Sequence, residues 1–317
     1  MENLTLTIAG ASGVIGRHIL QQALNRNWRV RILSRRFHIA DDDISKRKTT
    51  HYVWNPEERF ELDANSDVVK ALEGSDFLIN LAGASLLRGR LGTKMQQQVL
   101  KSRLDSTNRL IEAYKRCQRP PRVWAQASAV GFYGDTKEAT VTEENPRGDL
   151  FLSRVCEQWE NTAKKITDIN PQIRLLIARF GMVLADDATA WAKMAAPIRR
   201  GFGGCIGSGR QWYSWIDADD AATALLHLYQ QKDASGVYNF TSPQPVRQKE
   251  LAGSIARFYH KPAFFWVPAF VIRLLMGKTG DELLLTSCKV TPGKLLKSGF
   301  QFNYPGINEE IAHIGKT

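Results

Sequence analysis

Three glycines within seven residues make segment 10–16 (GASGVIG) the part of this chain best suited to holding phosphate groups. An apolar, β-branched stretch at 4–9 precedes it and predicts a buried strand, and residues 17–24 follow with apolar residues at helical spacing. Backbone N–H groups at a helix N-terminus attract a pyrophosphate, and glycines let it approach closely. A simple strand-to-helix turn does not need three glycines. The turn therefore predicts a nucleotide site made by Gly10, Ser12, Gly13, Val14, Ile15 and Gly16.

The residues after the second predicted strand, 30–33, indicate which nucleotide is bound. Ser34, Arg35 and Arg36 follow this strand, where a carboxylate would accept a hydrogen bond from the ribose 2′-hydroxyl of NAD. An arginine guanidinium instead binds a 2′-phosphate with two hydrogen bonds, and a nearby hydroxyl can donate to it. We therefore expect NADP(H) rather than NAD as the cofactor.

The elements that must position these residues alternate between strand and helix along the first half of the chain. Further strands are predicted at 51–54, 76–83, 122–128 and 173–178, and helices at 67–72, 95–117 and 151–166. Such alternation requires a parallel sheet with helices on both faces, whose ligands lie beyond the carboxyl ends of the strands. Leu81, Ala82, Gly83 and Ser128 lie at such ends and join the predicted cofactor site. The predicted fold class is α/β, a Rossmann-type doubly wound parallel sheet.

The sequence changes character after about residue 185. We predict an NADP-binding Rossmann-type domain at 1–185, completed by parts of 210–245, and a smaller α/β substrate lobe that makes up most of 186–317. The glycine-rich loop 201–209 and the aromatic run 212–215 are expected to form a lid and an apolar floor for a substrate, or to pack as ordinary loops. The aspartates Asp217, Asp219 and Asp220 are expected to cap the helix predicted at 219–231, and we expect no metal site.

The composition is that of an ordinary soluble globular protein, with 43% hydrophobic and 24% charged residues among 317. The net charge of +11 suits anionic small molecules, and the basic residues are scattered without interleaved aromatics, so no nucleic-acid partner is expected. The four cysteines lie far apart and indicate free thiols in a reducing compartment. Segment 264–276 is too short to span a bilayer, and the first strand begins too early for a signal peptide. We expect a cytoplasmic monomer or homodimer with no membrane partner.

Several of these segments together resemble the extended short-chain dehydrogenase/reductase superfamily, whose members are similar to epimerases and dehydratases. They are the glycine turn, 80–83 (NLAG), 128–134 (SAVGFYG) and 215–220 (WIDADD). An atypical subfamily of "epimerase family" proteins is more similar still, with its markers at 102–104, 143–146, 207–211 and a C-terminal segment at about 265–315. The resemblance covers nearly the whole chain. It implies a Rossmann-type domain, a smaller C-terminal substrate lobe and no known substrate, and it adds Arg103 to the expected cofactor site.

The catalytic residues of that superfamily are missing from this chain. The resemblance implies a tyrosine as acid and base, a lysine four residues later and a serine or threonine that polarises the reacting oxygen. Alignment places Leu150, Arg154 and Ala129 at these positions, and shifting the helix by one residue gives Phe151 and Val155 instead. A tyrosine of pKa ~10 needs a nearby cation to act at neutral pH.

Two hypotheses follow from the missing residues. The first is an oxidoreductase or epimerase that uses other groups, with Ser128 and Tyr133 as candidates and Arg103 as the cation. Both hydroxyl groups also have an ordinary structural interpretation, as a backbone-bonded serine and a packed aromatic residue. The second hypothesis is a non-catalytic NADPH-binding sensor or regulatory module.

Overall fold

A seven-stranded parallel sheet forms the centre of the protein, which we describe from a computed structural model covering residues 4–36, 48–58, 60–86 and 92–315. The strands lie in the order β12-β7-β5-β4-β1-β2-β3, so the chain winds in both directions from β1 and the predicted doubly wound fold is confirmed. In chain order the strands are β1 (Thr5–Ala9), β2 (Arg29–Ser34), β3 (Thr49–Val53), β4 (Phe77–Asn80), β5 (Val123–Ala129), β7 (Arg174–Phe180) and β12 (Gly236–Phe240). The last strand, β12, lies within 210–245, the segment from which we expected the final elements of this domain.

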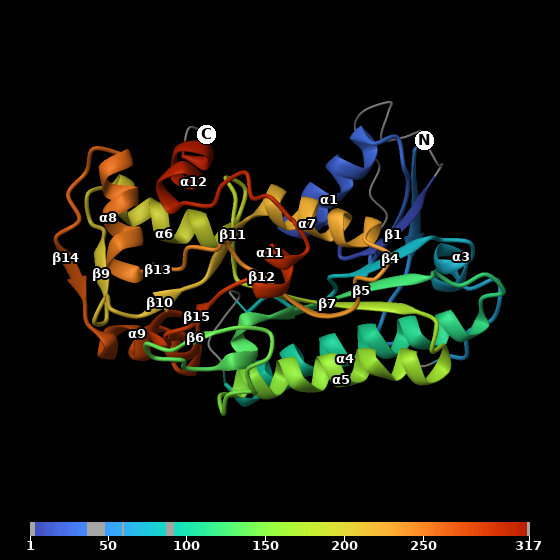
Figure 1. Ribbon diagram of the computed structural model, residues 1–317. Helices are drawn as coiled ribbons and strands as arrows, with labels where there is room; N and C mark the ends of the chain where they lie inside the picture. Colours follow the sequence, from blue (N-terminus) through green and yellow to red (C-terminus); the bar gives the residue numbers. More distant parts are fainter. Residues whose placement is uncertain (1–3, 37–47, 59, 87–91, 316–317) are drawn as a thin grey trace.

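Helices cover both faces of the sheet, as buried parallel strands require (Figure 1). On one face α1 (Val14–Asn25) packs against α7 (Ala218–Gln230), and Ile19 and Leu225 are buried with the strands. On the other face α4 (Thr93–Arg116) packs against α5 (Phe151–Ile169), with α3 (Asp67–Leu72) beside α4. Each helix therefore places an apolar stripe on the sheet and leaves its polar side to solvent.

Most of the remaining elements form a smaller lobe beyond one end of the sheet, on the left in Figure 1. Its helices are α6 (Thr189–Arg199), α8 (Gln248–Phe258), α9 (Ala269–Met276), α10 (Lys278–Gly280), a π-helical turn (Asp281–Leu285) and α12 (Ile307–Ile314), while α11 (Gly293–Lys297) lies beside β12 of the sheet. A 3-10 turn, η2 (Val130–Tyr133), follows β5. The short strands form four pairs: β6 (Thr140–Val141) with β15 (Lys289–Val290), β8 (Met182–Leu184) with β11 (Trp215–Asp217), β9 (Gly204–Ile206) with β14 (Phe265–Val267), and β10 (Trp212–Tyr213) with β13 (Val246–Arg247). Leu295 of α11 reaches back into the core of the sheet.

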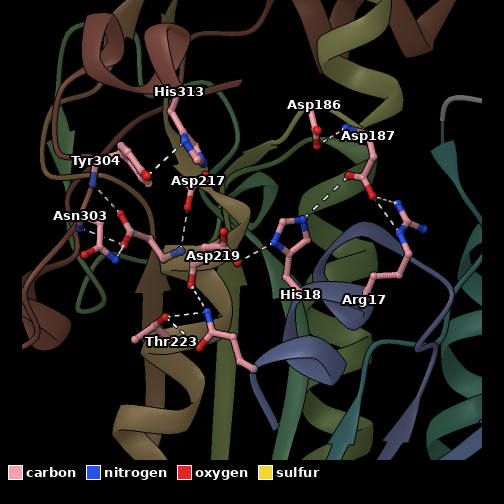
Figure 2. A network of polar contacts seen from close by, with 12 residues as sticks. Arg17, His18, Asp186, Asp187, Asp217, Asp219, Thr223, Asn303, Tyr304 and His313 are labelled. Carbon is pink, nitrogen blue, oxygen red and sulfur yellow. Dashed lines mark hydrogen bonds and ion pairs between the residues drawn. The ribbon is translucent and has the colours of Figure 1, made fainter. Parts of the chain in front are cut away.

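A polar network joins this lobe to the sheet (Figure 2). Asp217 is the N-cap of α7 and accepts a hydrogen bond from the N–H of Asp220 at 2.8 Å, which confirms the predicted capping role for this aspartate. The carboxylate of Asp219 lies 2.7 Å from Nδ1 of His18 in α1. Asp220 accepts hydrogen bonds from the backbone of residues 303–304, just before α12. Asp219 and Asp220 therefore connect α7 to α1 and to the C-terminal segment, while Asp217 caps α7 itself.

The four cysteines are free thiols, as predicted. Burial raises the pKa of Cys117 to about 12 and that of Cys156 to about 11, so neither is a reactive thiolate at neutral pH. Among the helices of the described residues, none combines the length and the apolar character needed to cross a membrane.

Candidate functional site

The loop after β1 and the first turn of α1 lie so close to neighbouring backbone that a side chain would not fit at Gly10 or Gly16. Gly10 has φ = +91°, and a Cβ there would lie 2.9 Å from the carbonyl carbon of Leu81. A Cβ on Gly16 would lie 2.5 Å from the carbonyl oxygen of Gly10. Gly13 is the N-cap of α1, and no side chain caps this helix. The N–H groups of the first turn are therefore left for an anion.

Arg17 and His18, in the first turns of α1, join this loop to the lobe (Figure 2). Arg17 donates to the carbonyl of Ser12 and, through Nε, to the carboxylate of Asp187 at 2.8 Å, just before α6. The hydrogen bond that the His18 ring donates to the Asp219 carboxylate raises the pKa of His18, which favours its charged form. Neither contact was expected from the sequence, because Asp187 and Asp219 are about 170 and 200 residues away from their partners.

The carboxyl ends of β1, β2 and β4 lie at one edge of the sheet, as the alternation of strands and helices predicted. Ala9 is level with Leu33 on one side and with Asn80 on the other. Strand β4 ends at Asn80, earlier than predicted, because the Asn80 side-chain oxygen accepts a hydrogen bond from the N–H of Ala82 and turns the chain. Leu81 to Gly83 therefore form the loop that faces the glycine turn.

Ser34 ends β2 at the same edge, and Arg35 and Arg36 follow it with exposed side chains. The Ser34 hydroxyl donates to the carbonyl oxygen of Arg36. The structure thus presents two solvent-exposed guanidinium groups beside the glycine turn. An anionic group bound at this edge would meet both positive charge and N–H donors.

Arg103, in α4, covers the loop after β4. Its side chain lies against Gly83, where a Cβ would be 3.2 Å from its Cγ. Its Nη1 donates to the carbonyl oxygens of Ala84 and Val99, and its guanidinium lies 5.0 Å from the ring centre of Trp159. Burial lowers the pKa of Arg103, but an arginine remains protonated at neutral pH. Within the described residues, no carboxylate pairs with it.

The two hydroxyl candidates, Ser128 and Tyr133, belong to one buried hydrogen-bond network. Ser128 donates to Glu160 at 2.6 Å, and Glu160 pairs with Arg179 through two contacts of 2.8 Å. Arg179 donates to the Tyr133 hydroxyl at 2.9 Å, and that hydroxyl donates to Asn239 at 2.7 Å. Burial raises the pKa of Tyr133 to about 12, which is opposite to the change that an acid–base tyrosine needs. The catalytic role of these hydroxyls stays a prediction.

The positions that the resemblance assigns to the catalytic groups carry no group able to exchange a proton. Ala129 and Leu150 line a cavity, and Arg154 is exposed and donates to the carbonyl of Asp149. The N-terminus of α5, which begins just after Leu150, is capped instead by Glu282, whose carboxylate accepts the N–H groups of residues 151–152 at 3.2 and 2.8 Å. Sequence reasoning did not find Glu282, which comes from the far C-terminal segment.

The cavity has a volume of about 640 Å³ and lies between the sheet edge and the lobe. The sheet side contributes Arg103, Ala129 and the start of α5, while the lobe contributes α6, α8 and the β9 loop. Glycines of the loop 201–209 and the aromatic side chains of Trp212 and Tyr213 line it, which agrees with the predicted apolar floor. A cavity of this size accommodates a small organic molecule.

The partners in the buried network were also missed, although one signal was present. Arg179 follows the apolar residues 175–178 in the buried part of β7, and Glu160 stands beside Trp159 on the apolar face of α5. A charge in a buried stretch of strand requires an opposite charge nearby. The sequence does not indicate which of its carboxylates supplies that charge.

Comparison with known proteins identifies the family. The model of the NAD dependent epimerase/dehydratase family matches residues 6–240, and a domain of unknown function, DUF1731, matches 267–314. The second match confirms the C-terminal segment expected at about 265–315.

Relatives and solved structures agree with these matches. An epimerase family protein of Staphylococcus saprophyticus is 36% identical over 310 residues, which cover 96% of this chain and 98% of that protein. The human epimerase family protein SDR39U1 (isoform 2), solved with NADPH, superposes with a TM-score of 0.85 at 27% identity, covering 99% of this chain and 100% of the human one. A nucleoside-diphosphate sugar epimerase from Corynebacterium glutamicum gives 0.75 at 26% identity, covering 98% of this chain and 58% of that protein. This chain belongs to the NAD dependent epimerase/dehydratase family.

Proposed function

We propose that this protein binds NADP(H) at the edge of its sheet and uses it to oxidise, reduce or epimerise a small molecule held in the adjoining cavity. The observation that carries the proposal is the cavity of about 640 Å³ beside Ala129 and Leu150, the positions that the family resemblance assigns to catalytic groups. A protein that only senses the cofactor does not need such a cavity. The NADPH in the human relative supports the choice of dinucleotide.

The residues at the edge fit a dinucleotide. The close approach at Gly10 and Gly16 leaves backbone where side chains would stand, and the uncapped first turn of α1 offers N–H groups to a pyrophosphate. Arg35 and Arg36 supply positive charge where a 2′-phosphate would lie, and no carboxylate occupies positions 34–36. These features favour NADP(H) over NAD.

A nicotinamide cofactor supplies hydride transfer when it is bound. The cavity walls would exclude water from the reacting atoms, and Arg103 would donate hydrogen bonds to a negatively charged or carbonyl oxygen. Because its guanidinium stays protonated, Arg103 stabilises charge and does not take up a proton. An acid–base step would require a further group; Ser128 and Tyr133 are the candidates, although neither is among the residues that line the cavity.

The alternative is a sensor or regulatory module that binds NADPH without turning it over. The absence of a tyrosine–lysine pair on α5 favours it, as does the use of both candidate hydroxyls inside the protein. Both functions need the same cofactor site, so they differ only in turnover.

Two measurements test the proposal. Titration with NADPH and NADH should show at least a tenfold preference for NADPH. The Arg35→Ala/Arg36→Ala double variant should abolish this preference. The control variant Arg154→Ala, on the exposed face of α5, should keep it. NADPH consumption is then followed against a panel of carbonyl compounds. Consumption that depends on a carbonyl and disappears in Met194→Trp, which fills the cavity, supports an enzyme. Tight NADPH binding with no turnover across the panel overturns the enzyme in favour of the sensor.

A further inference from the structure

The wall of the cavity is mostly hydrocarbon, from its inner end to its mouth. Trp159, Leu152 and Phe180 line its inner part, and Met194 and Ile255 line the lobe side. At the mouth Phe202 is 67% exposed. An apolar molecule could therefore enter and lie in this cavity without leaving polar atoms unbonded.

The polar side chains of the wall are already bonded to the protein. The Tyr213 hydroxyl donates to the Leu284 carbonyl at 2.7 Å, and the Ser214 hydroxyl donates to the Cys288 carbonyl at 2.8 Å. The remaining polar side chains contact the protein in the same way: Gln248 with Ile206 and Gly204, Thr286 with Asp281, Trp212 with Glu138, and Glu282 with the N-terminus of α5. Few of these side chains are therefore left to form hydrogen bonds with the hydroxyl groups of a ligand.

A nucleotide sugar does not suit such a wall. Its base, phosphates and sugar hydroxyls all need hydrogen-bond partners, and each group buried without one costs about 1–3 kcal/mol. Among the described residues that line the cavity only Arg103, Lys193 and Glu282 carry a charge, and Lys193 is exposed to solvent. The wall therefore disfavours a diphosphate with a sugar attached.

Arg103 is the exception in this apolar wall. Two backbone carbonyls occupy its Nη1, and the described residues offer no hydrogen-bond partner to its Nε or Nη2. A guanidinium with one free edge and no carboxylate binds an anionic group with two parallel hydrogen bonds.

From these contacts we infer that the substrate is a predominantly hydrocarbon molecule with one anionic group that binds Arg103, and not a nucleotide sugar. The inference rests on the proposed function, because it names the substrate class of the same site. It also separates this chain from the sugar epimerase from Corynebacterium glutamicum that it resembles.

The test uses a matched pair of fluorescent probes on the full chain with saturating NADP⁺, which does not fluoresce. The first probe, 1-anilinonaphthalene-8-sulfonate, combines an aromatic hydrocarbon with one sulfonate, and the second, N-phenyl-1-naphthylamine, has the same rings without charge. We expect one site per chain for each probe, with UDP-glucose displacing neither at millimolar concentration. Displacement by UDP-glucose, or binding of UDP-glucose detected by calorimetry, overturns the inference.

Variants locate the probes. Met194→Trp on α6 should weaken both probes at least tenfold, whereas Ala192→Trp, exposed on the same helix and outside the cavity, should not. If Met194→Trp does not fold, Ala190→Phe inserts a smaller group from the same helix. Probe binding unaffected by a folded cavity variant overturns the inference.

Arg103→Met should weaken the sulfonate probe about tenfold and leave the uncharged probe within twofold, since a hydrogen bond to a charged group contributes that much. Arg116→Met, an exposed position on the same helix, is the control. Equal weakening of both probes contradicts the assignment to Arg103.

The probes are also titrated without NADP⁺, and NADP⁺ binding is measured on its own. A chain that binds the probes and no dinucleotide contradicts the proposed function alone, while one that binds NADP⁺ and exchanges the probes for UDP-glucose contradicts this inference alone.

Discussion

Glu160 and Arg179 form a two-pronged ion pair inside the protein, with Nε and Nη2 of the arginine each 2.8 Å from a carboxylate oxygen. Both side chains are almost completely buried, at 1% and 4% exposure. Breaking a buried pair from one side costs about 3–5 kcal/mol, because the remaining charge is left without compensation.

We therefore expect Glu160→Gln to lower the free energy of unfolding by about that amount in urea titrations. The control is Glu157→Gln on the same helix, whose half-exposed pair with Arg147 contributes about 1 kcal/mol or less. Equal losses in the two variants would contradict a special role for the buried pair.

Removing the Tyr133 hydroxyl separates its structural role from a catalytic one. In Tyr133→Phe, Arg179 and Asn239 each lose a partner, which is expected to cost about 1–3 kcal/mol of unfolding free energy. The affinity for NADPH should stay within twofold, because the hydroxyl points into the network and Tyr133 does not line the cavity. Calorimetric titration and urea unfolding of the same preparation measure both quantities. Unchanged stability together with lost turnover would instead support the tyrosine as a catalytic residue.

The glycine turn offers a comparison of two substitutions three residues apart, at Gly13 and Gly16. A Cβ in Gly16→Ala would lie 2.5 Å from a carbonyl oxygen and 2.6 Å from the Cα of Ala11, so the loop must move. Overpacking of this kind costs about 1–3 kcal/mol, and the moved loop should bind NADPH at least tenfold more weakly. In Gly13→Ala the added Cβ meets its nearest neighbour at 3.5 Å, an ordinary contact, so stability should change by less than about 1 kcal/mol. If the two variants unfold at the same urea concentration, the close approach at Gly16 is not the reason for its glycine.

Glu310 makes the stability depend on pH. Burial in α12, followed by the nearby Asp217 and Asp220 carboxylates, raises the pKa of Glu310 to about 9. Between the usual glutamate pKa of ~4.3 and this value, the unfolded chain loses the proton and the folded chain keeps it, so stability falls as pH rises through that window. Below the window both states are protonated and the group has no effect.

Glu310→Gln should therefore raise the melting temperature at pH 7–8 and flatten its decline between pH 5 and pH 9. Glu309→Gln carries the same charge change one residue away, but on an exposed side chain, and should leave the decline as it is. Thermal unfolding at one-unit pH steps measures both variants. If the wild-type melting temperature instead increases from pH 5 to pH 9 and Glu310→Gln removes that increase, the predicted direction of the pH effect is wrong.

Local pattern was enough to predict the fold and the sheet edge at which the glycine turn lies. The period-two apolar strands, the helical stripes and the glycines at 10–16 each occupy a few consecutive residues, and the conformation of such a segment depends on those residues alone. The alternation of strands and helices predicted a parallel sheet, because two neighbouring parallel strands need a crossover connection, which is usually a helix. Even the early end of β4 came from a short-range contact, between Asn80 and Ala82.

The surroundings of the candidate residues Ser128 and Tyr133 could not be predicted in the same way. Tyr133 and Asn239 are 106 residues apart, and Glu282 caps a helix that begins about 130 residues earlier. Which acceptor a buried donor meets is decided by how helices and strands pack, and burial then sets the pKa of each group. The sequence alone determined that this chain is a doubly wound α/β protein with a glycine turn suited to a dinucleotide and no tyrosine–lysine pair. Only the tertiary structure decided that the remaining hydroxyls point into a buried ion-pair network and that Arg103 lines an apolar cavity without a carboxylate partner among the described residues. Both depend on contacts between segments that only folding brings together.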